Sequence, residues 1–217
     1  MVALCATLGH MTKAGAQADV ERAASGDETR TRLLAAAAEL IVERGWAAAT
    51  TRAVAERAEV NQALVHYHFR SVDALRRAAV TSALQPPIEA ALAELMDDRP
   101  LPESIALVMQ LIERWCREVS VGVLMAEALV RATRDPSMAR SLGESIRSWA
   151  EVLAPRLELA QARGVVRRDI AAPRMALVLG AFLDGYYLQR LTAAPLDPAE
   201  FTETLIGFLR PPQEETP

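Results

Sequence analysis

The chain has 217 residues, of which 51% are hydrophobic and 24% charged, so it holds enough apolar material for one large core or two smaller ones. Glycine, proline and aromatic residues are sparse while alanine, leucine, glutamate and arginine dominate, which favours helices and argues against a sheet protein with many turns. The formal net charge of -4 gives no general reason to expect a nucleic-acid partner, which must therefore be argued from local placement. We predict an all-α protein.

The cysteine content and the apolar runs indicate where the protein resides. Cys5 and Cys116 form neither a disulfide framework nor a metal-ligand spacing, which fits a reducing compartment. The opening MVALCATLGHM has no basic residues before its apolar run, and the later run MALVLGAFLDGYYL is interrupted by Asp184. We therefore expect a cytoplasmic protein that is neither secreted nor membrane-spanning, with residues 1–26 as a disordered tail because they show no lasting periodicity.

Four helices are predicted between about residues 27 and 82. The first carries apolar residues at helical spacing and ends at Gly45. Thr50 caps a short second helix, Asn61 caps a third, and Ser71 caps a fourth. Three short helices and a longer one thus follow one another along this part of the chain.

The second and third of these helices have the spacing of a helix-turn-helix. The positions expected to face inward are apolar: Ala55, Val60, Val65 and Phe69. In a DNA complex the third helix would enter the major groove, where Gln62 can bond a base edge or a phosphate and Leu64 can touch a thymine methyl. Tyr67 and His68 would then bond phosphate oxygens. The alternative is that this helix is only the surface of a small helical module, with Tyr67 half-buried.

Local charge favours the DNA interpretation weakly. Between Glu28 and Arg77 eight arginines stand against six acidic residues, although the whole chain is acidic. The positive excess is small, but it falls on the segment that carries the helix-turn-helix spacing.

The segment TRTRLLAAAAELIVERGWAAATTRAVAERAEVNQALVHYHFRSVDALRRAAV resembles the N-terminal DNA-binding region of TetR/AcrR-type transcriptional regulators. The resemblance lies in Gly45-Trp46 after the first helix, the Thr-Thr-Arg start of the second, the recognition-helix motif VNQALVHYHF, and the S-x-x-AL opening of the fourth. Further on, ARGVVRRDIAAPRMALVLGAFLDGYYL is similar to the late helical segment of that family, with Gly164, Asp169 and Gly185 at familiar places.

The resemblance implies a fold, a partner and a set of DNA-binding residues. The fold is an N-terminal three-helix helix-turn-helix domain over residues 27–72, followed by a larger helical ligand-binding and dimerisation domain over residues 73–217. The partners are double-stranded DNA with a palindromic operator, a second copy of the chain, and a small-molecule effector that releases a repressor from DNA. The residues implied at the DNA are Thr51, Arg52, Gln62, Ala63, Leu64, His66, Tyr67 and His68.

Two positions depart from the family pattern. Glu59 stands in the turn where glycine is usual, so the backbone there either tolerates a side chain or is strained. Val72 stands where a lysine is common after the capping serine, which removes a phosphate contact. Both changes predict weaker or less salt-dependent DNA binding than a more basic relative would show.

In the C-terminal part, helices are expected near residues 103–120, 122–134, 136–163, 172–193 and 198–210. The prolines of Gln85–Pro87 are expected to break or kink the preceding helix, and Asp97–Pro102 is expected to be a loop. Asp135-Pro136 and Asp197-Pro198 read as a cap followed by the first helical residue.

Two sets of residues are candidates for interfaces in this part of the chain. We expect an apolar dimer interface with two-fold symmetry, formed by Met175, Val178, Phe182, Tyr186, Phe201, Leu205 and Leu209, the alternative being ordinary core. Soft or large side chains and one acid within an apolar run are weaker candidates for an effector pocket: Met109, Trp115, Met125, Glu127 and Trp149. Most such residues in proteins are core, and Glu127 has the alternative of an exposed or ion-paired acid.

The competing interpretations are an enzyme and a helical adaptor that has lost DNA binding. A di-iron bundle needs paired Glu-x-x-His motifs, and no histidine follows His68. His66 and His68 lie on different faces of a helix and cannot chelate one metal there. No phosphate-binding glycine loop or Ser/His/Asp arrangement is visible, so we expect neither catalysis nor a cofactor.

Overall fold

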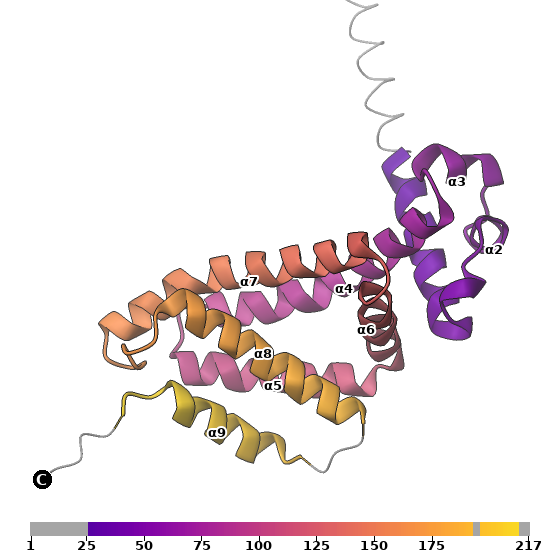
Figure 1. Ribbon diagram of the computed structural model, residues 1–217. Coiled ribbons are helices and arrows are strands. Elements are labelled where there is room, and N and C mark those ends of the chain that lie inside the picture. Colours follow the sequence, from indigo (N-terminus) through magenta and orange to yellow (C-terminus); the bar gives the residue numbers. More distant parts are fainter. Residues whose placement is uncertain (1–25, 193–195, 213–217) are drawn as a thin grey trace, which may run out of the picture. The chain divides into compact units, whose positions relative to one another are not determined.

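The computed structural model describes residues 26–192 and 196–212, and apart from Gly26 the predicted disordered tail lies outside the described residues. The described residues form α-helices and one 3-10 turn, with no strand among them (Figure 1), which confirms the all-α prediction. A first helix covers residues 26–44 of the described chain. The further elements are η1 (Trp46–Ala48), α2 (Thr51–Arg57), α3 (Gln62–His68), α4 (Val72–Met96), α5 (Leu101–Arg117), α6 (Val119–Ala132), α7 (Pro136–Ala162), α8 (Ala172–Leu191) and α9 (Pro198–Leu209).

The chain divides into two compact units between Val80 and Thr81, inside α4. The sequence analysis placed the domain boundary after residue 72, at the start of α4. That boundary stays a prediction. Of the break or kink predicted at Gln85–Pro87, a break does not occur, because α4 continues through Pro86 and Pro87 to Met96, and a kink stays a prediction. Proline removes an amide donor from a helix, but it leaves φ within the helical range, so the backbone can continue past it.

The N-terminal unit is held by caps and by arginines that join its helices. Thr50 accepts a hydrogen bond from the amide of Ala53, and Asn61 accepts one from Ala63, as the sequence predicted. Arg57 on α2 forms ion pairs with Glu39 and Glu43 of the first helix at 3.1 and 2.7 Å. These contacts fix α2, the first half of the helix-turn-helix, against the first helix.

Arg76 on α4 joins the start of that helix to the segment before α2. Its Nε donates to the carbonyl oxygen of Ala49 at 3.0 Å and its Nη2 to that of Ala47 at 3.1 Å. Ser71 caps the helix through the amide of Ala74 at 3.1 Å. The backbone carbonyl groups in and next to η1 therefore accept hydrogen bonds from a side chain of α4.

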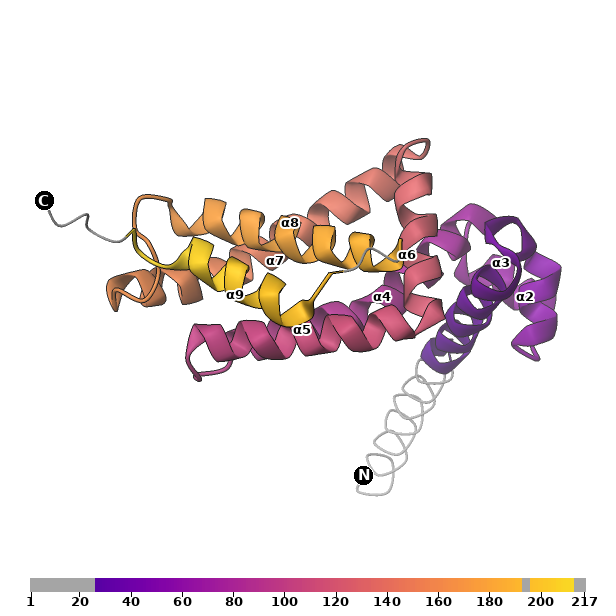
Figure 2. The same cartoon turned by 90° about the horizontal axis from the view of Figure 1, so that it is seen from below.

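The C-terminal unit is a helical bundle in which α7 packs against both α6 and α8, and α5 packs against α8 and α9. Figures 1 and 2 show α9 running beside α5 in both views. The core contains fully buried side chains from α5, α7 and α8, among them Ile105, Leu153, Leu157, Leu179 and Tyr186. The helix bounds agree with the sequence predictions to within three residues, and Asp135 and Asp197 cap α7 and α9 as expected.

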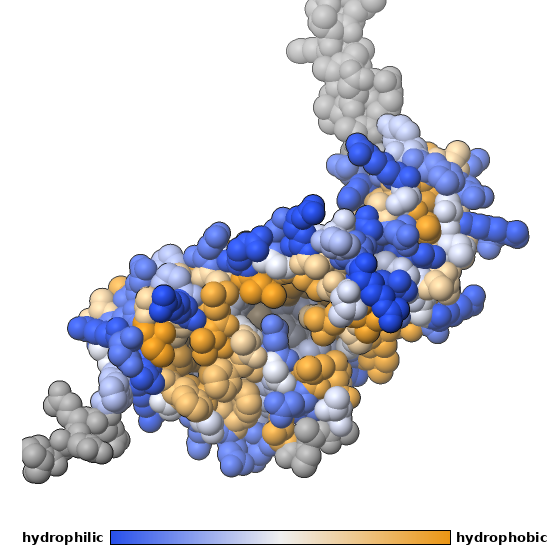
Figure 3. All heavy atoms as spheres, in the orientation of Figure 1, coloured by the Kyte–Doolittle hydropathy of each residue, from blue (hydrophilic) through white to orange (hydrophobic). Residues whose placement is uncertain are grey.

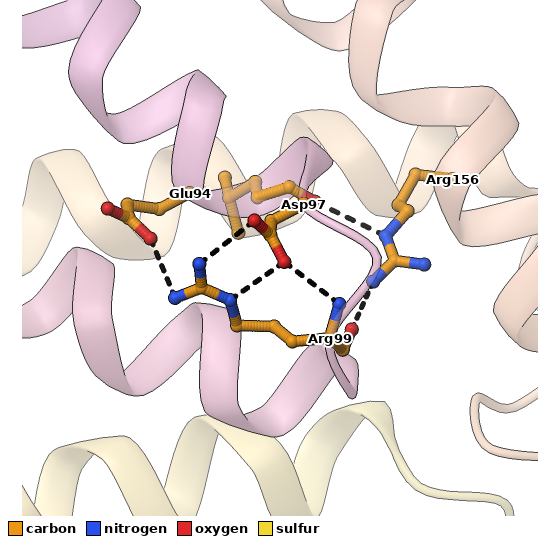
Figure 4. Close-up of polar contacts among 5 residues, drawn as sticks. Glu94, Asp97, Arg99 and Arg156 are labelled. Carbon is orange, nitrogen blue, oxygen red and sulfur yellow. Dashed lines mark hydrogen bonds and ion pairs between the residues drawn. The ribbon is translucent and has the colours of Figure 1, made fainter.

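The C-terminal end of α4 is fixed to α7 by Arg156 (Figure 4). This buried guanidinium donates to the carbonyl oxygens of Leu95, in the last turn of α4, and of Arg99, which follows the helix. Arg99 in turn pairs with Glu94 at 2.9 Å and Asp97 at 3.0 Å. A positive charge at the negative end of a helix dipole is stabilising, and here it also satisfies carbonyl groups that no longer have helical partners.

Candidate functional site

The third helix presents its polar side to solvent. Val65 and Phe69 are buried at 2% and 6% exposure and Ala55 is buried too, as the helix-turn-helix spacing predicted, whereas Val60 is half-buried. On the other side Gln62, Ala63 and His66 are exposed, and Leu64 and Tyr67 are 38% and 81% exposed. His68 is half-buried, with its ring edge-on to Tyr67 at a centroid separation of 5.1 Å. Tyr67 is thus free to contact a partner, and the alternative in which it is half-buried does not hold.

The two candidate residues at the start of α2 differ in their availability. Thr51 is half-buried, whereas Arg52 is exposed and forms an ion pair with Glu56 one turn later, with Nε and Oε1 at 2.8 Å. The hydrogen bond from Arg52 to Glu56 raises the pKa of its guanidinium, so the group is a permanent cation. The exposed side chains that can bind a phosphate or a base thus come from both helices of the motif.

The turn between α2 and α3 has the backbone conformation that the sequence analysis questioned. Glu59 has φ of 54°, in the left-handed region that favours glycine, and its side chain is exposed. Arg32 of the first helix donates to the carbonyl oxygens of Ala58 and Glu59. The turn therefore keeps its geometry with a non-glycine residue, held in place by a side chain from outside the motif.

The five effector-pocket candidates differ in their burial. Met109 is buried in the core at 2% exposure, while Trp115, Met125, Glu127 and Trp149 are half-buried. The ring of Trp149 packs against Gly180 of α8, where a Cβ atom would lie 3.0 Å from its Cζ3. Close helix packing at a glycine accounts for the position of this ring, and the role of all five in ligand binding stays a prediction.

A polar cluster that the sequence analysis missed joins α5 to α8. Tyr186, fully buried, donates to Glu113 Oε1 at 2.5 Å, and Arg190 binds both carboxylate oxygens of Glu113 at 2.9 and 3.1 Å. Burial alone would raise the pKa of Glu113, but the hydrogen bonds from Arg190 and Tyr186 outweigh it and hold this pKa below its ordinary value. The one available signal was the pairing of Tyr186 and Arg190 one turn apart on α8.

The dimer candidates divide into core and surface residues. Met175, Tyr186, Leu205 and Leu209 are buried within the single chain and pack in its own core, so they have no surface left for a partner. Val178 is 49% exposed, and Phe182 and Phe201 are half-buried. The same face of α8 and α9 carries exposed apolar residues that the sequence analysis did not select: Leu177, Leu188 and Phe208.

A shallow cavity of about 360 Å³ lies on this face of α8 and α9. Its lining is mainly apolar: Val178, Ala181, Phe182, Gly185, Tyr186, Gln189 and Phe201. The ring of Phe182 packs between those of Phe201 and Phe208, with centroid separations of 6.3 and 5.5 Å. The face is therefore an aromatic surface with a recess rather than a closed pocket.

Two other features are absent from the part of the chain that the structure describes. Across residues 26–192 and 196–212, no helix has both the length and the hydrophobicity needed to cross a membrane. Within the same ranges, no group of three or more histidine, cysteine, aspartate or glutamate residues is placed to hold a metal ion.

Two family models match different parts of the chain. Residues 33–79 match the model of bacterial regulatory proteins of the tetR family, and residues 116–210 match the C-terminal model of BetI-type transcriptional repressors. The HTH-type transcriptional regulator UidR of Escherichia coli (strain K12) is 28% identical over 143 residues, which are 65% of this chain and 71% of that protein.

Solved structures share the fold over most of the chain. Salmonella enterica GusR superposes with a TM-score of 0.69 at 22% identity, covering 84% of this chain and 95% of that one. The multidrug binding protein EbrR, complexed with imidazole, superposes with a TM-score of 0.65 at 25% identity, covering 86% and 92% of the two chains. The polar side of α3 in the helix-turn-helix is exposed, and a second helical unit follows in the chain. The chain belongs to the TetR family of bacterial regulatory proteins and is a DNA-binding transcriptional regulator, not an enzyme.

Proposed function

We propose that this protein is a cytoplasmic repressor that binds a palindromic operator as a homodimer and leaves it when a small-molecule effector binds the C-terminal unit. The observation that carries the proposal is the exposed side of α3, where Gln62 and Tyr67 stand free on a helix anchored by Val65 and Phe69. An exposed tyrosine and glutamine on an anchored short helix fit major-groove binding better than a solvent-facing role, because large aromatic side chains gain little from lying free in water.

In this proposal the residues of α3 divide their roles. Gln62, at the N-terminal end of the helix, hydrogen-bonds a base edge, and Leu64 contacts a thymine methyl. Tyr67 and His68 bond phosphate oxygens, as does Arg52 from the start of α2. Thr51, Ala63 and His66 complete the surface that lies against the DNA.

The apolar face of α8 and α9 supports the homodimer. Leu177, Val178, Leu188 and Phe208 are between 46% and 55% exposed, so α8 and α9 of the single chain leave a surface with several large apolar side chains in contact with solvent. A second copy related by a two-fold axis would cover it with the same residues, giving an isologous four-helix interface. Two copies of α3 related by the same axis would match the two halves of a palindrome.

The proposal that a small molecule releases the protein from DNA is supported by the family and by one similar solved structure. EbrR is a multidrug binding protein whose structure contains imidazole, and it shares the fold of this chain. A ligand releases DNA when it binds one of two dimer arrangements more tightly and so shifts the population away from the arrangement that fits the operator.

Selection of bound sites from randomised duplexes tests the proposal. The expected product is an inverted repeat with half-sites about one helical turn apart, bound by two chains per duplex in analytical ultracentrifugation. A selected site without internal symmetry, or one chain per duplex at saturation, would contradict the dimeric part of the proposal. No enrichment at all would contradict sequence-specific binding.

A further inference from the structure

The direction of α3 is set by the turn that precedes it, because only residues 58–61 separate α2 from α3. In this turn the amide of Glu59 donates to the carbonyl oxygen of Glu56 at 3.3 Å, and the amide of Val60 donates to that of Ala55 at 3.0 Å. These two bonds form a Schellman motif, in which one residue adopts the left-handed conformation that glycine adopts most easily. That residue is Glu59, with φ of 54°.

The side chain at this position strains the turn. In the left-handed conformation the Cβ atom of Glu59 approaches the carbonyl oxygen that follows it, which glycine avoids. A relaxation of this backbone angle would rotate everything that follows in the motif, including Gln62 and Tyr67 on α3. The proposed DNA contacts of these two residues therefore require that the turn is held from outside.

Arg32 of the first helix holds the turn. Its Nη2 donates to the carbonyl oxygen of Ala58 and, at 3.5 Å, to that of Glu59. The carbonyl carbons of Ala58 and Glu59 are the two end atoms of the dihedral angle φ of Glu59, so a donor that bonds both oxygens restricts this angle directly. Both bonds go to main-chain atoms, so they do not depend on the carboxylate of Glu59.

The other end of α3 is anchored by different contacts. Phe69, which follows the last residue of α3, is buried at 6% exposure, and Val65 within the helix is buried at 2%. The guanidinium of Arg30 lies over the ring of Phe69, 5.5 Å from its centroid. Loss of Arg32 would therefore leave this end in place and release the end that carries Gln62.

The surface around the turn is polar. Arg32, Glu59 and Gln62 are exposed. Figure 3 shows mostly hydrophilic residues at the outer edge of the N-terminal unit where Figure 1 draws α2 and α3. A hydrogen bond made near water adds only modestly to the free energy of folding, so removal of the Arg32 side chain should leave the unit folded. Its effect should be seen in the direction of α3.

We propose that Arg32 is a positioning residue for DNA recognition: it holds the backbone at Glu59 in the conformation that glycine would keep unaided, and so aims Gln62 at its base pair. The assignment rests on the proposed function, because it requires that α3 lies against DNA. Arg32 acts through the turn and does not itself contact a base. The contribution of Arg32 to DNA affinity therefore depends on the residue at position 59.

A double-mutant cycle measures this dependence. DNA affinity is determined by fluorescence anisotropy with the duplex selected above, at a temperature where circular dichroism shows every variant folded. Arg32→Met keeps a long side chain and removes its donors. It should weaken binding at least tenfold in the parent protein and in Glu59→Gln, which lacks only the charge, but at most threefold in Glu59→Gly. Losses by the same factor in all three backgrounds would overturn the assignment.

Two further variants separate positioning from charge. Arg44→Met removes an exposed arginine from the same helix and should weaken binding at most threefold. Arg32→Lys, whose ammonium group can still donate to a carbonyl oxygen, should keep more of the affinity than Arg32→Met. Arg32→Met should also discriminate less between the selected duplex and unrelated duplexes. Equal weakening on both kinds of duplex would make Arg32 a phosphate contact and overturn the assignment.

Amide hydrogen exchange without DNA separates failure of this assignment from failure of the proposed function. The amide of Val60, bonded to Ala55, should exchange severalfold faster in Arg32→Met than in the parent, but Arg32→Met should not accelerate it in Glu59→Gly. Exchange at the parent rate in Arg32→Met would overturn the assignment. If the parent selects no duplex, the proposed function fails, whereas a parent that binds and an Arg32→Met that binds equally well contradict this assignment alone.

Discussion

Arg52 and Glu56 form an ion pair one turn apart on the exposed surface of α2, with Nε and Oε1 at 2.8 Å. In the proposed complex this guanidinium binds a DNA phosphate, so Glu56 competes with the DNA for it. Both side chains are largely solvated, at 82% and 65% exposure, so the pair itself adds little to the stability of the fold. Its effect should therefore be seen in DNA affinity.

Glu56→Gln should tighten DNA binding roughly three- to tenfold at low salt, because it frees Arg52 and removes a negative charge close to the phosphates. Fluorescence anisotropy with the selected duplex at two salt concentrations measures the change, which should shrink as salt rises. Glu158→Gln, far along the chain on α7, is the control for the change in net charge. A Glu56→Gln variant with the parent affinity at both salt concentrations would remove Arg52 from the interface.

Gln62→Ala should relax sequence preference at one base pair of each half-site. A side chain that bonds a base edge contributes about 1 to 3 kcal/mol of discrimination there, while other positions are unaffected. Binding to a series of single-base variants of the selected duplex measures this. Equal weakening on every variant would instead assign Gln62 to the phosphates.

Glu59→Gly should stabilise the protein by roughly 0.5 to 1.5 kcal/mol, because glycine adopts a positive φ without the steric cost that a side chain incurs. Urea unfolding followed by circular dichroism provides the measurement. Glu59→Gln keeps the side chain and removes the charge, so it should leave the unfolding free energy near the parent value. If the glutamine variant gains as much as the glycine variant, charge and not backbone strain is the cause.

Much of the helix-turn-helix follows from local sequence signals. Thr50 and Asn61 are good caps, and Val65 and Phe69 lie one helical turn apart, so short-range chemistry determines both the helix starts and the buried side. The strain at Glu59 was also foreseeable, because the position is one where glycine is usual in similar sequences. Once Val65 and Phe69 are known to be buried, the helical repeat predicts which residues of α3 are exposed.

The C-terminal unit was less predictable because its helices are apolar on several sides. Met175 and Tyr186 of α8 are core residues, whereas Val178 on the same helix is exposed, and the sequence pattern alone did not separate them. Which side of an apolar helix is covered depends on its neighbours, which are distant in the chain. The pairing of Glu113 with Arg190, 77 residues apart, is likewise invisible to local patterns.

Glu113→Gln should destabilise the protein by about 1 to 3 kcal/mol at pH 7, because it leaves Arg190 and Tyr186 without a charged acceptor in a partly buried place. The pKa of Glu113 is lowered in the folded state from an ordinary value of 4.5. Its contribution is thus complete above that value and is lost as the pH falls through the lowered pKa.

Unfolding free energies of the parent protein and Glu113→Gln between pH 3 and pH 7 check this sign. The difference between the two proteins should be constant in the upper part of the range and should shrink below about pH 4.5. A difference that grows on acidification would mean that the carboxyl is neutral in the folded protein.

The most direct test of the account is the DNA affinity of Tyr67→Ala. Tyr67 is 81% exposed on α3, so its truncation should leave the thermal unfolding midpoint unchanged, and any loss of binding reports the interface alone. With the selected duplex and with unrelated duplexes, anisotropy should show weaker binding by a similar factor, as expected for a phosphate contact. Parent-like affinity of Tyr67→Ala on all of these duplexes would contradict the claim that the exposed side of α3 lies against DNA.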